Sequence, residues 1–257
     1  MRTIIVGQRG ITGTTGKFLA RALAARYTSH HCQNNYDLAI RWGNSWARVP
    51  AEVGLPEAAA ISLASDKLAA LQALRNAGVR VPDFVEIARA SMSDMSACIP
   101  GFVRTRYHHG GSGLAYCPDI ATLAELDLLN YSYLIKEINK QEEWRIHIGE
   151  WRGVRLTYAQ RKLRMLDAFP GKVWNYAAGW RFHSRSIDNT DPELMTQAQK
   201  AVTTLGLTFG CVDIVKDGRL SWVLKVNTAP GLKSEPSQTA YLAFFKEAIS
   251  KVERSRR

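Results

Sequence analysis

Long hydrophobic runs, closely spaced cysteines and dense proline or glycine segments are all missing from this sequence of 257 residues. The longest apolar runs, such as Ala58–Ala64, fall far short of the roughly 20 residues that cross a bilayer, so we expect no membrane anchor. The N-terminus has neither the apolar stretch nor the cleavage site of a signal peptide, which favours a cytoplasmic protein. Nine prolines and 19 glycines are too few for a disordered or collagen-like chain. With 46% apolar residues, the chain is expected to bury a substantial core in one large domain or two modest ones.

The four cysteines lie far apart in the sequence. Cys32, Cys98, Cys117 and Cys211 are separated by 66, 19 and 94 residues, which matches no zinc-ligand or redox spacing. We therefore predict reduced and mostly buried thiols.

Acidic residues are also scarce, since 23 Asp and Glu stand against 34 Lys and Arg, for a formal net charge of +11. The excess is confined to residues 1–50, at +6, and residues 145–185, at +7, while the rest of the chain is −2. Such segments suggest surfaces that meet an anion, whether nucleotide phosphates, an acidic peptide or nucleic acid. A generally basic, solvated surface is the other interpretation.

The first glycine-rich segment follows a predicted strand, Thr3–Val6, and precedes a predicted helix that starts near Phe18. A phosphate-binding P-loop would need Gly where Ile11 stands and Ser or Thr where Phe18 stands. The spacing therefore favours a plain turn.

Periodicity and capping residues predict the later elements. Between Glu143 and Ile148, apolar and polar residues alternate, which predicts a strand with one dry and one charged face. The remaining predictions are strands over Asp37–Arg41, Gly101–Arg106 and Tyr133–Ile138, a helix capped by Ser65 and stopped by Gly78, helices over Pro192–Leu205 and Ser237–Val252, and a hairpin of Phe209–Val215 with Leu220–Asn227.

Four segments carry a recognisable pattern in a fixed order. They are the helix and Pro exit of Ser65–Pro82, Phe102-Val-Arg-Thr with the glycines of 110–113, Leu134-Ile-Lys-Glu-Ile138 with Glu143-Trp-Arg145, and Phe209-Gly-Cys-Val-Asp213-Ile with Val223-Leu-Lys-Val-Asn227-Thr-Ala-Pro-Gly231. Together they resemble the ATP-grasp superfamily, particularly its carboxylate–amine ligases such as the ribosomal-protein glutamate ligases and the D-alanine ligases.

The resemblance implies an α/β chain with a short N-terminal α/β subdomain, residues 1–60, and an ATP-grasp module of two α+β lobes, residues 61–257. It implies ATP and Mg²⁺ as cofactors, and the formation of an amide through an acylphosphate. The implied site consists of nucleotide contacts by Lys67, Arg104, Gly111, Ser112, Gly113, Lys136, Glu137, Ile138 and Lys162, metal ligands Asp213 and Asn227, catalytic Arg145, Arg161 and Lys225, and substrate contacts by Arg41 and Asn44. Taken alone, Lys67 also reads as a solvated helix residue and Asn227 as part of a turn.

Two positions depart from the family pattern. Arg104 stands where the resemblance implies Lys, which keeps the charge but replaces a point donor by a planar fork. Lys225 stands where the family has a Glu that bridges two magnesium ions, so a cation occupies the place of an anion. Two interpretations stay open: an active ligase, and a nucleotide-binding protein that has lost ligase chemistry.

The register of the last hairpin tests the metal site. A two-residue turn at Asp217-Gly218 would point Asp213 away from the face of Lys225 and Asn227, whereas a three-residue loop would place all three on one face. We predict the three-residue loop.

The partners follow from the same reasoning. Arginines suit a carboxylate through forked hydrogen bonds, which favours a small-molecule or peptide substrate with a carboxylate, together with an amine. A less favoured alternative is a nucleic-acid binder that uses the basic segment 145–185 with Trp151, Trp174, Tyr176 and Trp180, although these aromatics are expected in the core. A homo-oligomer is compatible with the sequence.

Overall fold

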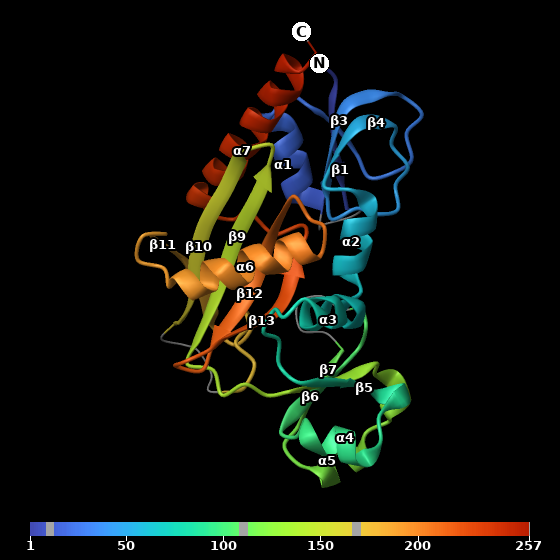
Figure 1. Cartoon of the computed structure of the whole chain (residues 1–257), viewed down its shortest axis with the longest axis vertical. Coiled ribbons are helices and arrows are strands. Elements are labelled where there is room, and N and C mark those ends of the chain that lie inside the picture. Colours follow the sequence, from blue (N-terminus) through green and yellow to red (C-terminus); the bar gives the residue numbers. More distant parts are fainter. Residues whose placement is uncertain (9–12, 108–112, 166–170, 257) are drawn as a thin grey trace.

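The computed structural model describes residues 1–8, 13–107, 113–165 and 171–256, and it contains three β-sheets. Figure 1 shows them one after another along the long axis, with the N-terminal sheet at one end, a five-stranded sheet in the middle and a small lobe at the other end. The fold class is mixed α/β, as predicted.

The N-terminal sheet is parallel. Its strands are β1 (Thr3–Gly7), β2 (Arg26–Thr28), β3 (Tyr36–Trp42) and β4 (Ala51–Leu55), in the order β2-β1-β3-β4, with helix α1 (Thr14–Ala22) packed against β1 and β2. The predicted strand–turn–helix order is thus confirmed at both ends of the glycine-rich turn, whose middle, residues 9–12, lies outside the described residues.

Two helices connect this sheet to the small lobe. Helix α2 (Ala58–Ser65) is followed directly by α3 (Lys67–Asn76), and Gly78 ends the second helix at a φ of +71°. The cap of α3 is Asp66, whose side chain accepts from the Ala69 N–H, and not the predicted Ser65. The prediction of Ser65 as the cap was wrong because Ser65 is the last residue of α2.

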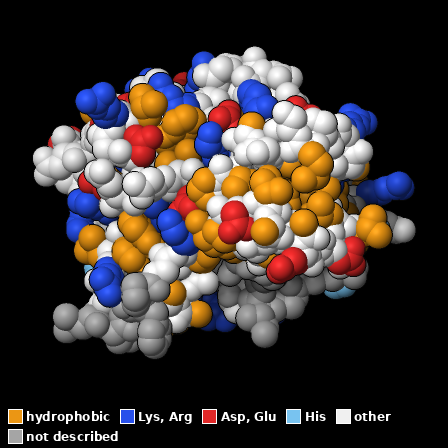
Figure 2. Space-filling model, turned by 90° about the horizontal axis from the view of Figure 1, so that it is seen from below, with side chains coloured by type: hydrophobic (Ala, Val, Ile, Leu, Met, Phe, Trp, Pro, Cys, Tyr) orange, Lys and Arg blue, Asp and Glu red, His pale blue; other side chains and the backbone are white. Residues whose placement is uncertain are grey.

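The small lobe is an antiparallel sheet covered by short helices. The sheet has the order β5-β8-β6-β7, and the elements are β5 (Phe84–Glu86), the 3-10 turn η2 (Ile87–Arg89), α4 (Met92–Ala97), β6 (Gly101–Arg104), β7 (Leu114–Cys117), α5 (Ile120–Glu125), η3 (Leu128–Asn130) and β8 (Tyr133–Lys136). Met92, Ile120 and Leu129 are exposed on this lobe. Seen from below, hydrophobic side chains gather on the right of the molecule, with Lys and Arg spread around them (Figure 2).

The five-stranded sheet is antiparallel and lies between two helices. Its order is β11-β10-β9-β12-β13, and the elements are β9 (Glu142–Trp151), β10 (Val154–Arg164), β11 (Trp180–Arg185), α6 (Pro192–Thr204), β12 (Phe209–Lys216), β13 (Ser221–Asn227) and α7 (Glu235–Arg254). Helix α6 packs on β9, β12 and β13, and α7 packs on β10 (Figure 1). The predicted hairpin and both C-terminal helices are confirmed.

The face of this sheet that meets α7 changes character along its length. The side chains are apolar where the sheet packs against α7 (Val154, Leu156, Phe209). Further along the strands they become polar (His147, Tyr158) and then charged (Arg145, Lys162, Asp213). Strand β9 therefore has one dry face, as predicted, but its polar face is covered too, because Glu143 and His147 are buried.

The cysteine prediction is confirmed. All four cysteines are free, and Cys98, Cys117 and Cys211 are buried. No helix within the described residues combines the length and the apolarity that a membrane crossing requires. The division at residue 60 stays a prediction.

Gly101 opens β6 at a position where a side chain does not fit. An added Cβ would lie 2.3 Å from the Cys98 carbonyl oxygen and 2.7 Å from the Ile135 carbonyl oxygen. Because both are backbone atoms, we expect Gly101→Ala to lower the free energy of unfolding by about 1–3 kcal/mol. Gly171→Ala is the matched control, since no atom of the described residues lies within 4 Å of its added methyl group. Urea titration of both variants measures the difference, and equal midpoints would contradict the expected clash.

Candidate functional site

A cavity of about 890 Å³ lies between the small lobe and the charged end of the five-stranded sheet. The small lobe contributes residues of β6, β7 and β8, including Phe102, Arg104 and Lys136. The linker 137–140 and the segment 171–182 close two further sides. The cavity is thus formed by parts of the chain that are far apart in sequence.

The cavity is strongly basic. Among the described residues, its lining contains three carboxylates, Glu137, Glu143 and Asp213, against nine cations, which are Arg104, Lys136, Lys140, Arg145, Lys162, Lys172, Arg181, Lys225 and Lys233. A low-dielectric cavity with such an excess of positive charge favours a polyanionic ligand.

Asp213 lies at the centre of the charged row. Arg145 donates to it through Nε at 2.8 Å and Nη2 at 3.2 Å, and Lys225 Nζ lies 3.3 Å from Oδ2. Burial raises the pKa of the Asp213 carboxyl, but the charges of Arg145 and Lys225 outweigh burial, so the net pKa lies well below its usual value. Asp213 is therefore a carboxylate that two cations already neutralise.

The other two carboxylates are paired as well. Glu143 is buried between Lys140, at 3.0 Å, and Lys162. Glu137 binds Lys172 at 2.7 Å and accepts from the Tyr116 hydroxyl at 2.7 Å. Each of the three carboxylates that the described residues bring to this cavity therefore has a cationic partner.

The hairpin of β12 and β13 places Asp213, Lys225 and Asn227 on one face of the sheet, but not through the loop that we predicted. Its connection has four residues, Asp217–Leu220, so the predicted three-residue loop is wrong. Leu224 is an extra residue that forms a bulge, and it restores the register in which Asp213 lies opposite Lys225. The predicted common face of Asp213, Lys225 and Asn227 is confirmed.

Several predicted nucleotide contacts line the cavity. These are Arg104, Lys136, Glu137, Ile138 and Lys162, together with the predicted catalytic residues Arg145 and Lys225. Gly113, which has a φ of +61°, is not among the lining residues, and the predicted contacts Gly111 and Ser112 lie outside the described residues.

Three predicted residues lie elsewhere, which corrects their place in the site. Arg161 is opposite Trp144 and hence on the other face of the sheet from Arg145, where it pairs with Glu142 at 3.0 Å. Arg41 donates to the Ala47 carbonyl at 3.0 Å, and Asn44 donates to the Gly7 carbonyl at 2.7 Å. The side chains of Arg41 and Asn44 thus bind backbone carbonyls beside the N-terminal sheet and are not among the residues that line the cavity.

Lys67 and Asn227 lie just behind the cavity lining. Lys67 Nζ donates to the Ala64 carbonyl at 2.7 Å and to the Val226 carbonyl at 3.3 Å. Burial, together with the charge of Lys225, lowers the pKa of Lys67 to about 8. Asn227 Oδ1 accepts from the Ala229 N–H at 2.9 Å, as expected for a turn.

The sequence reasoning missed an aromatic wall. Trp174 and Trp180 stack with ring centroids 4.0 Å apart, and Tyr176 is 69% exposed with the Arg181 guanidinium 3.5 Å from its ring centroid. Trp174, Tyr176 and Trp180 line the cavity and do not lie in the core, contrary to prediction. The prediction that these aromatic residues lie in the core was wrong because the cavity is formed by distant segments, which no local sequence pattern reveals.

Gln160 is a further lining residue that the sequence did not indicate. Its Oε1 lies 3.1 Å from His147 Nε2, and His147 Nδ1 lies 3.1 Å from the Tyr241 hydroxyl. Because Oε1 can only accept, Nε2 of the imidazole carries the proton and Tyr241 donates to Nδ1. Because Oε1 is engaged in this way, the Gln160 amide nitrogen is the donor that this side chain can offer to a ligand in the cavity.

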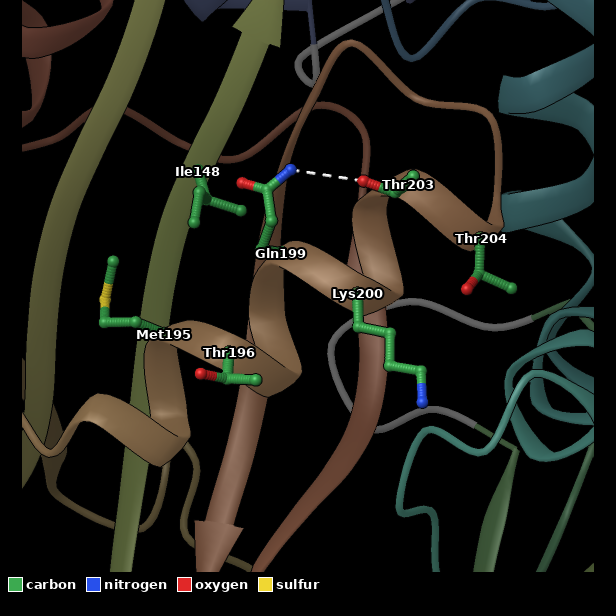
Figure 3. A pocket seen from close by; sticks show the side chains of 7 residues that line it. All are labelled: Ile148, Met195, Thr196, Gln199, Lys200, Thr203 and Thr204. Atoms are coloured by element: carbon green, nitrogen blue, oxygen red, sulfur yellow. Dashed lines mark hydrogen bonds between the residues drawn. The ribbon is translucent and has the colours of Figure 1, made fainter.

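A second hollow of about 610 Å³ lies over α6, on the other side of the sheet. Figure 3 shows side chains of α6 from Met195 to Thr204 together with Ile148, and the Gln199 amide that donates to Thr203 Oγ1 at 3.1 Å. Its one charged group, Lys200, donates to the Gly78 carbonyl at 3.0 Å. The hollow brings no reactive groups together, so the basic cavity is the candidate site.

The residues of the basic cavity fit a nucleotide better than a magnesium ion. Mg²⁺ prefers carboxylate and other oxygen ligands. Asp213 is paired with two cations and Asn227 Oδ1 is engaged by Ala229, and the described residues contain no group of three His, Cys, Asp or Glu side chains placed to hold a metal. The described residues therefore offer no open set of ligands for magnesium.

A scan against protein-family models and a search of curated proteins found no match for this sequence. Solved structures do match. D-alanine–D-alanine ligase from Bacillus anthracis complexed with ATP aligns at a TM-score of 0.72 and 14% identity, over 100% of this chain and 98% of that chain. The ATP-grasp RimK domain protein from Sphaerobacter thermophilus aligns at 0.62 and 14%, over 95% and 97%.

A third match covers less of its own chain. N5-carboxyaminoimidazole synthetase from Staphylococcus aureus complexed with ADP aligns at a TM-score of 0.67 and 14% identity, over 95% of this chain and 75% of that chain. At such identities the likeness concerns the backbone architecture, and the architecture agrees over nearly the whole chain. The chain therefore has the ATP-grasp fold.

Proposed function

We propose that the chain binds ATP in the basic cavity and uses it to join a carboxylate to an amine. The observation that carries the proposal is the excess of nine cations over three carboxylates in a cavity enclosed by two sheets. Solved structures of similar fold support it, since several of them are ligases or synthetases and three were determined with ATP or ADP.

The apolar part of the cavity suits an adenine ring. Phe102, Ile135 and Leu224 are among its lining residues, beside the linker. In the described part of the chain, neither the Ile138 N–H nor the Glu137 carbonyl has a hydrogen-bond partner. One donor and one acceptor of the backbone are thus available to the edge of a base.

The cations suit the phosphates and the transferred group. Arg104 and Lys136 extend from the small lobe and Arg145 from the large sheet, so a triphosphate would be held from both sides. In the proposed reaction, a carboxylate oxygen of the substrate takes the γ-phosphoryl group and ADP leaves. An amine then attacks the acylphosphate carbon, and phosphate leaves as the amide forms. Preorganised cations stabilise the charge that builds up on the transferred oxygens.

A second candidate is a nucleotide-binding protein without ligase activity. It is favoured by the pairing of Asp213 with Arg145 and Lys225, because this pairing occupies a buried carboxylate of the cavity. Both candidates share the nucleotide site and differ in the chemistry that follows.

Calorimetric titration tests the shared site. ATP and ADP are expected to release or absorb heat, and Lys136→Met is expected to weaken ATP binding about tenfold, because it removes a charged hydrogen-bond donor. Lys246→Met is the matched control, since Lys246 is exposed on α7 and does not line the cavity. No heat with any adenine nucleotide would contradict the proposal.

Mass spectrometry separates the two candidates. The protein is incubated with ATP and pooled amino acids, with and without magnesium, and new amides and ADP are measured. Amides formed together with ADP support the ligase, and nucleotide binding without either product supports the second candidate.

A further inference from the structure

The inference concerns the metal requirement of the site and rests on the proposed nucleotide binding. Gln160, Arg145, Asp213 and Lys225 lie in register on β10, β9, β12 and β13, and so form one row across four strands. Asp213 is 4% exposed at the centre of this row. Both its oxygens are engaged, Oδ1 by Arg145 and Oδ2 by Arg145 and Lys225.

This arrangement disfavours a divalent cation. A metal at Asp213 would face the Arg145 guanidinium and the Lys225 ammonium within hydrogen-bond reach of the same carboxylate. Glu137 and Glu143 offer no alternative, because Lys172, Lys140 and Lys162 neutralise them. The four side chains of the row carry a net charge of +1. The ammonium of Lys67, which donates to the Val226 carbonyl beside Lys225, adds a further positive charge close by.

The same arrangement favours direct contact with phosphate. The Lys225 side chain is 33% exposed and lines the cavity. An ammonium has three N–H donors, and the ion pair with Asp213 at 3.3 Å leaves donors for an anion that enters the cavity. The same carboxylate accepts both hydrogen bonds from Arg145, so it keeps Lys225 and Arg145 next to each other.

We propose that Arg145 and Lys225, held by Asp213, stand in for a divalent cation, so that the cavity binds a nucleotide polyphosphate without any metal ion.

Calorimetry of the parent protein with ATP tests this without a variant. One titration is made in a buffer with a chelator and the other with excess magnesium. We expect the two dissociation constants to agree within about threefold, because no group of the site gains a partner when the metal is added. Heat in magnesium alone would overturn the inference and leave the proposed nucleotide site standing. No heat in either buffer would overturn the nucleotide site itself.

Variants of Lys225 test whether its ammonium takes the place of the metal ion in ATP binding. Lys225→Met is expected to weaken ATP binding in chelator about tenfold or more, whereas the matched charge loss in Lys246→Met changes it little. Lys225→Glu returns a carboxylate to the row, so magnesium is expected to strengthen ATP binding by this variant and not by the parent. An equal response of Lys225→Glu and parent to magnesium would overturn the inference. Circular dichroism of each variant verifies that it is folded.

Discussion

Replacing Arg145 with methionine is expected to lower the free energy of unfolding by about 3 kcal/mol, because it leaves a buried carboxylate short of its main partner. Asp213 is 4% exposed, and Arg145 provides two of its three close contacts with cationic groups. Lys225 remains in the variant, which places the effect at the lower end for a broken buried ion pair. Urea denaturation at pH 7 measures it.

Two further variants make this result specific. Arg155→Met removes the same kind of side chain from an exposed position of β10 and is expected to change stability by no more than about 0.5 kcal/mol. The double variant Arg145→Met with Asp213→Leu removes the buried charge as well and is expected to regain most of the loss. If Arg145→Met were as stable as Arg155→Met, the guanidinium would not be what holds Asp213.

Acidification is expected to destabilise the protein through His147. Burial lowers the pKa of His147 to about 4, because the imidazole is almost fully enclosed and neutral between Tyr241 and Gln160. In the unfolded chain the pKa is about 6.5. As pH falls, the unfolded chain binds the proton first, so stability is full above about pH 6.5 and is lost towards about pH 4. The loss over this range is about 3 kcal/mol.

A series of urea titrations from pH 7 to pH 4 measures this loss. His147→Asn has no imidazole to titrate, so its stability is expected to vary less between pH 6.5 and pH 5, a range above the unfolded pKa values of Asp and Glu. The comparison is between slopes and not between absolute stabilities, because the variant also loses packing. Parallel slopes in parent and variant would show that His147 is not the titrating group.

Much of the architecture was predictable. The strands at Thr3 and Asp37, the helix that starts at Pro192 and the final helix have strong periodicity and caps, and all were found close to their predicted bounds. Four ordered segments were enough to indicate the ATP-grasp fold, because each combines a secondary-structure pattern with residues at fixed spacing. The same segments contained most of the cations that line the cavity.

The predictions that were wrong depend on contacts between distant segments. Arg161 and Lys162 are neighbours in sequence, yet the pleat of β10 sends them to opposite faces, and only the pairing with β9 decides which face meets the cavity. The bulge at Leu224 set the register of the last hairpin, and a bulge leaves no local sign comparable to Asp217-Gly218. Trp174 and Trp180 are large aromatic side chains of the kind expected in a core, but they line the cavity.

The sequence by itself determined the order of strands and helices, the fold they form and the surplus of positive charge, because these depend on local periodicity, residue spacing and composition. Only the tertiary structure decided that Asp213 is paired with Arg145 and Lys225, the pairing on which the proposed metal-free binding rests. The reason is that this ion cluster joins three strands whose alignment is set by long-range pairing, and a side chain's charge state and partners follow from that alignment and from burial.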